Sequence, residues 1–172
     1  MTESVIALDP GGRSGWASAL MSEDKLVLTG GGVMRQDLMA RWLADQQVVA
    51  AASLPASVQR MAKEMAVYGV IVCESWRPFP KDGSMAWIQG DPLLSAQHVG
   101  QIRLIADLSG ARYVEQPPSS KTMYTASMPK KLLDLDVYSS EQHDKDARMH
   151  LWGYFKENWF TASQDPESVV YT

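Results

Sequence analysis

The chain has 172 residues, of which 45% are hydrophobic, and a formal net charge of −4, values that suit a single domain with its own core. Its single cysteine, Cys73, excludes a disulfide framework and a zinc site built from cysteines. The sequence has no apolar run long enough for a membrane span and no secretory signal at its N-terminus, so we expect a cytoplasmic protein without membrane partners.

The first part of the sequence alternates apolar runs with short polar turns. Residues 5–8, 15–21 and 25–34 predict three strands in an antiparallel meander, because the turns between them are short. Residues 36–52 are rich in Ala, Leu, Met and Gln, which favours a helix. A second helix is predicted from about residue 55 to residue 67, where apolar side chains recur at helical spacing.

The second part of the sequence alternates strands with helices. Residues 68–75 contain a continuous apolar run, which is typical of a strand buried on both faces. A helix is predicted over 93–108, a strand over 111–117 that ends at two prolines, and a last helix over about 140–158. Residues 161–172 are predicted to form a loose tail.

These elements together predict an α/β fold with one mixed sheet of five strands. The first three strands are expected to be antiparallel, and the last two to join the sheet in parallel through helical crossovers. Residues 1–160 would form the only domain, followed by the tail.

Two acidic residues follow buried strands. Asp9 ends the first strand and Glu74 ends the fourth. If these strands are neighbours, both carboxylates face one crevice at the carboxyl edge of the sheet. Two buried carboxylates repel each other unless a cation lies between them, and Mg²⁺ is the usual cation. Alternatively, each acid only caps a turn or a helix.

The last helix offers a third group of polar side chains. His143, Asp146 and His150 are spaced at i, i+3 and i+7, so they share one face of the helix. We select His143 and Asp146 as functional residues. Asp144 points about 100° away beside Arg148 and is expected to be solvated. The alternative is that this cluster is an ordinary charged helix surface.

The combined acids predict metal-dependent phosphodiester hydrolysis. Two Mg²⁺ ions about 4 Å apart can activate a water molecule and stabilise the leaving oxygen. Asp9 would bridge both ions, while Glu74 and Asp146 would each complete one coordination shell. His143 would be a ligand or would position and deprotonate the water.

Charge distribution leaves a nucleic-acid partner open. The net charge of −4 argues mildly against a general nucleic-acid binder. Residues 117–131, however, contain Lys121, Lys130 and Lys131 and no acid, so a local basic face is possible. Arg13, at the tip of the glycine-rich turn, either touches a DNA backbone or is solvated.

The glycine-rich turn after Asp9 has a second interpretation. DPGGRSG could be the phosphate-cradling loop of an actin-like nucleotide-binding domain. Such proteins need a duplicated second domain, and 172 residues leave no room for it. We therefore interpret the glycines as a tight turn between two strands.

Taken in order, these residues resemble the RuvC family of Holliday-junction resolvases, in the RNase H-like superfamily. The family has an opening strand with Asp-Pro-Gly, a glycine-bearing third strand, a catalytic glutamate, a Pro…Lys segment and a closing acid before an alanine. The corresponding segments here are ALDPGGRSGWA, GGGVMR, LPASVQRMAKEMAVYGVIVCES, HVGQIRLIADLSGARYVEQPPSSKTM and HDKDA.

The resemblance implies an RNase H-like fold and a site with two Mg²⁺ ions, for which Mn²⁺ can substitute, and no small-molecule cofactor. It implies Asp9, Glu74 and Asp146 as metal ligands. His143 falls where some members carry an acid and others a histidine. Lys121 falls near a lysine that contacts the scissile phosphate region, although a solvated loop lysine is the alternative.

The resemblance also implies branched DNA as a partner and a homodimer that makes two symmetric cuts. The helix around 100–108 is then the expected interface, unless its apolar face only covers the sheet. The compact form resembles phage-type members, so the cytosol of a bacterium or of a phage-infected cell is the expected location.

The sequence departs from the family in two places. The segment between the lysine region and the closing motif is shorter here. The family's junction-wedging aromatic follows the catalytic glutamate, where Trp76 and Phe79 are candidates, but Arg77 occupies the closest spacing. These side chains either contact DNA, where an aromatic stacks on a base, or pack under the loop.

The function predicted from the sequence is therefore a structure-selective endonuclease that resolves four-way DNA junctions by paired cuts. One alternative keeps the fold and chemistry but cuts flaps, forks or RNA–DNA hybrids. A catalytically inactive DNA-binding protein is disfavoured because all three acids are present.

Overall fold

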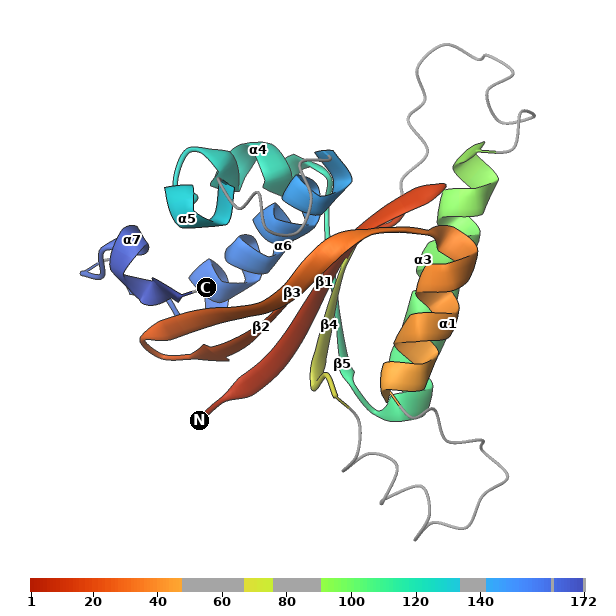
Figure 1. Ribbon diagram of the computed structural model, residues 1–172, viewed down its shortest axis with the longest axis horizontal. Coiled ribbons are helices and arrows are strands. Elements are labelled where there is room, and N and C mark those ends of the chain that lie inside the picture. Colours follow the sequence, from red (N-terminus) through yellow and green to blue (C-terminus); the bar gives the residue numbers. More distant parts are fainter. Residues whose placement is uncertain (48–66, 76–90, 134–141, 162, 172) are drawn as a thin grey trace, which may run out of the picture.

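The computed structural model describes residues 1–47, 67–75, 91–133, 142–161 and 163–171. One six-stranded sheet, in the order β5-β4-β1-β2-β3-β6, runs through its centre (Figure 1). Helices α1 (Gln36–Gln47) and α3 (Asp91–Ser109) cover one face of the sheet. The other face carries the helices α4 (Ser119–Thr125), α5 (Lys130–Leu133) and α6 (Gln142–Asn158), with a further short helix beside them.

The strands confirm the predicted mixed α/β sheet. The strands β1 (Glu3–Asp9), β2 (Arg13–Ser22) and β3 (Lys25–Arg35) form the antiparallel meander. The strand β4 (Val70–Glu74) pairs in parallel with β1, and β5 (Arg112–Gln116) pairs in parallel with β4. The carboxyl ends of β1, β4 and β5 therefore meet at one edge of the sheet.

The number of strands and the loose tail were predicted wrongly. A short helix, α7 (Pro166–Val169), leads into a sixth strand, β6 (Val170–Tyr171), which pairs in parallel with β3. The Asp165 side chain caps α7 by accepting from the Glu167 N–H, and Val170 is fully buried. Two residues are too few for a periodic pattern, so this strand cannot be recognised from local sequence alone.

The predicted helices agree where the structure describes them. The helix expected over 36–52 is present as α1 up to Gln47, and the one expected over 55–67 lies almost wholly outside the described residues. The short helices α4 and α5 were not predicted, because proline and serine interrupt any helical pattern over 117–131. Among the described helices, none combines the length and the apolar character that a bilayer crossing demands.

The core has one layer on each face of the sheet. Val5 and Ala7 of β1 pack toward α6, which contributes the buried Trp152. Ile6 and Leu8 point the other way, toward α1 and α3. This alternation is that of a strand buried on both faces. The first strand is therefore fixed on all sides, and Asp9 at its end has a defined position.

Helix α3 uses its apolar side to cover the sheet. Ile102 and Ala106 are fully buried in the core layer that β1 and β4 share with α1. On the outer side, Leu104 is 56% exposed and a methyl group on Gly100 would meet nothing within 4 Å. The covering role predicted as the alternative is thus present, and Leu104 and Gly100 lie on the exposed side of the helix.

Candidate active site

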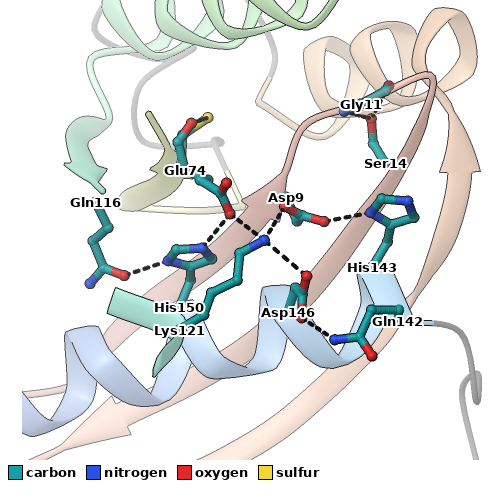
Figure 2. A network of polar contacts seen from close by, with 11 residues as sticks. Asp9, Gly11, Ser14, Glu74, Gln116, Lys121, Gln142, His143, Asp146 and His150 are labelled. Carbon is teal, nitrogen blue, oxygen red and sulfur yellow. Dashed lines mark hydrogen bonds and ion pairs between the residues drawn. The ribbon is translucent and has the colours of Figure 1, made fainter. Parts of the chain in front are cut away.

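The site begins where two neighbouring parallel strands end. Leu8 of β1 pairs with Cys73 of β4, so Asp9 and Glu74 follow at the same level of the sheet. Ligand atoms of Asp9, Glu74 and His150 lie within 4.8 Å of one another. Figure 2 shows the side chains of β1, β4, α4 and α6 converging on this point.

Helix α6 brings three side chains of one face to the two strand ends. His143 Nδ1 lies 2.6 Å from Asp9 Oδ2, and Asp146 is turned toward the same group of acids (Figure 2). The Gln142 side-chain amide donates a hydrogen bond to Asp146 Oδ1. The spacing of i, i+3 and i+7 therefore places His143, Asp146 and His150 on the face of α6 that meets the two strand ends (Figure 2).

A glycine in β2 allows α6 to come this close. A methyl group on Gly15 would lie 1.8 Å from the carbonyl oxygen of His143, which is far inside van der Waals contact. Any larger residue would push the first turn of α6 away from the sheet. Gly15 therefore sets the distance between His143 and Asp9.

Lys121 lies at the centre of the acidic group. Its Nζ is 3.0 Å from Asp9 Oδ1, 2.6 Å from Glu74 Oε2 and 2.9 Å from Asp146 Oδ2. The side chain reaches this point from α4 and is 22% exposed. The resemblance implied a place for Lys121 near the scissile phosphate, with a solvated loop lysine as the alternative; in the structure its ammonium lies among the carboxylates.

His150 and Gln116 are the site residues that sequence reasoning missed. His150 is fully buried, and its Nε2 lies 2.8 Å from Glu74 Oε2. The Gln116 amide lies 2.8 Å from the other ring nitrogen, Nδ1. When its NH₂ faces Nδ1, its oxygen accepts from the Tyr154 N–H at 3.3 Å, and His150 then carries its proton on Nε2 and donates to Glu74.

Both missed residues had a signal in the sequence. His150 stood on the selected face of α6, one turn beyond Asp146, but nothing indicated its partner. Gln116 ends β5, the third parallel strand at this edge, so the rule that selected Asp9 and Glu74 selects it as well.

Burial and the neighbouring charges act in opposite directions on the pKa values of Asp9, Glu74 and Lys121. Burial raises the pKa of Asp9, and neither Lys121 nor His143 offsets it fully. Burial also acts on Glu74, but hydrogen bonds from His150 and Lys121 outweigh it and lower its pKa to about 2. Burial would lower the pKa of Lys121, yet the surrounding carboxylates raise it above its usual range. Glu74 is therefore ionised and Lys121 charged.

Comparison with known proteins gives a fold likeness. No family model and no curated protein matches the chain. RuvC from Thermus thermophilus matches at a TM-score of 0.55 and 13% identity, over 91% of this chain and 95% of that one. The same RuvC in complex with Holliday junction substrate matches at a TM-score of 0.56 and 14% identity, over 90% and 94% of the two chains. The chain has the RuvC fold.

The likeness to RuvC confirms the predicted resemblance at the level of the fold. The likeness extends over about nine tenths of both chains, so the shared arrangement of sheet and helices covers most of this chain. At 13% identity, the likeness shows the fold and not the roles of single side chains.

The prediction that Asp144 is solvated is wrong. Asp144 and Arg148 are both fully buried, with Arg148 Nη2 2.9 Å from Asp144 Oδ2. Arg148 also donates to the Leu132 carbonyl oxygen at 2.6 Å, and Gly32 of β3 donates a backbone hydrogen bond to Asp144. The helical repeat separated the two faces correctly, but α5 and β3 cover the second face in this RuvC fold.

The other predicted DNA-binding residues lie around the site or outside the described residues. Arg13 is exposed at the start of β2, just beyond the turn that follows Asp9. Lys130 and Lys131 are exposed on α5, where Lys131 Nζ donates to the Glu167 carbonyl oxygen at 2.8 Å. The remaining three, Trp76, Arg77 and Phe79, belong to 76–90, which the structure does not describe.

The donor set fits a hard divalent cation. Asp9, Glu74 and His150 each bring a ligand atom within 4.8 Å of the others, and the ammonium of Lys121 lies within hydrogen-bond distance of Asp9, Glu74 and Asp146. Oxygen ligands with one nitrogen are the chemistry of Mg²⁺ and Mn²⁺ sites.

A groove opens beside the acids. Its volume is about 560 Å³. The lining comes from α4 and α6 and includes Lys121, Thr122, Thr125, Gln142, Asp146 and Met149. The groove thus leads from Lys121 and Asp146 to the surface between α4 and α6.

Proposed function

We propose that the chain is a divalent-metal-dependent endonuclease that resolves four-way DNA junctions. The observation that carries the proposal is the convergence of Asp9, Glu74 and Asp146 around one cationic centre. This centre lies at the carboxyl edge of a sheet with the RuvC fold. A divalent metal ion held by these carboxylates next to a groove would be suited to phosphodiester hydrolysis.

In the proposed hydrolysis, the metal ions and the side chains would have different roles. Two Mg²⁺ or Mn²⁺ ions would supply Lewis-acid activation of water and stabilisation of the leaving oxygen. Asp9, between His143 and the other acids, would be the shared ligand, with Glu74 and Asp146 on either side. The side chain of His143 is 46% exposed, so its other ring nitrogen, Nε2, would accept a proton from water that enters from solvent.

Residues around the site would bind the DNA backbone. Arg13, Lys121, Lys130 and Lys131 are the candidates among the described residues, because cationic side chains contact phosphates without reading sequence. Trp76, Arg77 and Phe79 are proposed as further DNA contacts after the strand that ends at Glu74. Such an enzyme would act in the cytosol of a bacterium or of a phage-infected cell.

The proposed active form is a homodimer. A four-way junction has two equivalent cleavage points, and two copies of one site related by a two-fold axis match that symmetry. The outer side of α3, with the exposed Leu104, is the proposed interface. The solved complex of T. thermophilus RuvC with Holliday junction substrate supports junction DNA as the substrate.

Substrate choice is tested on a matched set of DNAs. A four-way junction, a flap, a fork and an RNA–DNA hybrid that share one sequence around the cleavage point are incubated with Mg²⁺. We expect a pair of symmetric nicks on the junction and much slower cleavage of the other three substrates. Faster cleavage of flaps, forks or hybrids would select the alternative nuclease function.

A further inference from the structure

The ammonium of Lys121 occupies the point where three carboxylates converge. Its distances of 2.6 to 3.0 Å to Asp9, Glu74 and Asp146 are those of charge-assisted hydrogen bonds. We infer that Lys121 competes with the metal: its ammonium balances the acids in the metal-free protein and leaves when the metal binds, which frees it for the substrate phosphate. This inference rests on the proposed nuclease function.

The carboxylates need a cation in the absence of metal. Three acids at one point repel one another, and without a nearby positive charge some would take up protons. Lys121 provides that charge from within the chain. Because three carboxylates face a single ammonium, the group keeps an excess of negative charge and still attracts a divalent ion.

The ammonium and a metal cannot share these oxygens. Each of the three acids directs an oxygen to Nζ, and a divalent ion bound to the same oxygens would lie within a few ångströms of it. Like charges at that separation repel strongly, above all in a partly buried site. Binding of the metal therefore requires the Lys121 side chain to move.

The structure provides an anchor for the helix and room for the side chain. Helix α4 is anchored by Tyr124, which is buried against Gly153 of α6. A methyl group on Gly153 would lie 2.6 Å from the Tyr124 ring, so the two helices are in close contact. The Lys121 side chain itself borders the groove of about 560 Å³ between α4 and α6. A lysine stem is flexible, so Nζ can turn into this groove while the backbone stays in place.

Metal binding and phosphate binding are then coupled through one side chain. Without metal, Lys121 is held by the acids and is not available to DNA. With metal, it is released beside the groove in which we place the substrate strand. Each ligand favours the conformation that the other needs, which is positive coupling between them.

The first test measures metal affinity in the absence of DNA. Mn²⁺ binding is titrated by calorimetry on wild type, Lys121→Met and the control Lys145→Met, after removal of metal with EDTA. Lys145 lies on α6 next to Asp146, so Lys145→Met also removes one positive charge near the site. Because Lys145 forms none of the three ion pairs of Lys121, this variant leaves those pairs intact. We expect about tenfold tighter binding for Lys121→Met and little change for the control.

Thermal unfolding of the same proteins provides a second readout. Lys121→Met should melt below wild type in EDTA, because its acids lack a counter-ion. Its melting temperature should rise more than that of wild type when Mn²⁺ is added, since a tighter ligand stabilises the folded state more.

The third test uses wild-type protein alone and holds even if the variant does not fold. Acetic anhydride labels lysine amines, and mass spectrometry measures the rate at each lysine. Labelling of Lys121 should be slow in EDTA and several-fold faster with saturating Mn²⁺, as its amine leaves the acids. Lys25, exposed on β3, should react equally in both conditions.

The outcomes separate the two proposals. If wild type and Lys121→Met bind Mn²⁺ equally, and Lys121 labelling ignores the metal, the competition is refuted while the metal-dependent nuclease stands. Weaker binding by Lys121→Met would refute it as well. If neither protein binds Mn²⁺ and the labelling of Lys121 does not change, both proposals fail.

Discussion

At the scale of single residues, His150 controls the position of Glu74. Replacing it with Phe removes the hydrogen bond to Glu74 Oε2 but keeps a ring in the buried space. Glu74 would then be less firmly oriented toward the metal, and its pKa would rise from its lowered value. We expect the Mg²⁺ concentration for half-maximal cleavage to rise about tenfold or more, which is typical for loss of an outer-shell partner.

A matched variant tests whether this effect comes from the hydrogen bond. Gln116→Met keeps His150 but removes the polar partner of Nδ1, so a smaller change in the same direction is expected. If His150→Phe cleaves with the metal dependence of wild type, the positioning role is wrong.

The residue scale also shows what a helical repeat can predict. The repeat correctly assigned Asp144 and Asp146 to different faces of α6. It could not predict that the face of Asp144 is covered, because that depends on α5 and β3, which lie far from it in sequence or were not predicted. A charged residue on a helix is solvated only when no other element packs over it.

At the scale of elements, the approach of α6 to β2 decides the geometry of the site. Gly15→Ala places a methyl group 1.8 Å from the His143 carbonyl oxygen, so the first turn of α6 must move away. His143 and Asp146 would then no longer reach Asp9 together. We expect cleavage to fall by about a hundredfold or more, since small misplacements of catalytic groups have effects of this size.

The control for Gly15→Ala comes from the turn that precedes β2. A methyl group on Gly12 would meet nothing within 4 Å, so Gly12→Ala should cleave junction DNA at close to the wild-type rate. Cleavage rates of both variants, with circular dichroism to confirm folding, complete the comparison. Equal activity of Gly15→Ala and wild type would contradict the close approach.

A contact between α3 and the turn after Asp9 makes stability depend on pH. His98 is fully buried, its Nδ1 lies 2.9 Å from Ser14 Oγ, and Ser14 accepts from the Gly11 N–H at 3.2 Å. Burial lowers the pKa of His98 from 6.5 to about 4. Between these values the unfolded chain binds the proton and the folded chain does not.

The sign of the effect follows from this difference. The contribution of His98 is fully present above pH 6.5 and is lost as the pH falls toward about 4, so the free energy of unfolding decreases by roughly 3 kcal/mol over this range. Urea unfolding of wild type and His98→Gln at several pH values measures it. The variant should lose most of this pH dependence; equal slopes for both proteins would contradict the assignment.

The elements predicted best were those with strong local signals. The buried strands that end at Asp9 and Glu74 are continuous apolar runs, and the helix α6 is long. The strand β6 and the helix α5 are short, and they are stabilised by contacts with β3 and between Lys131 and the α7 region rather than by local propensity. Tertiary packing decides such elements, so a sequence pattern does not reveal them.

At the scale of the whole molecule, the sheet brings together residues from distant parts of the sequence. Parallel pairing of β1, β4 and β5 places Asp9, Glu74 and Gln116 at one edge, and α6 crosses that edge with His143, Asp146 and His150. The predicted topology was sufficient to expect Asp9 and Glu74 to meet. It was not sufficient to place Lys121, because α4 reaches the edge through a short segment after two prolines.

The net charge of the whole molecule does not describe how its charges are distributed. A net charge of −4 argued mildly against nucleic acid, but three of the acids meet at the site, where Lys121 and a proposed metal offset them. Charge that is concentrated at one point does not describe the surface that DNA would contact.

The central claim is that Asp9, Glu74 and Asp146 hold the metal that cuts junction DNA. It is tested most directly by junction cleavage with Asp9→Asn, next to the exposed control Asp24→Asn, and by junction binding of both variants in EDTA. We predict that Asp9→Asn retains junction binding and loses cleavage in Mg²⁺ by on the order of a thousandfold or more, with Asp24→Asn unchanged. Cleavage by Asp9→Asn at the wild-type rate would contradict the account.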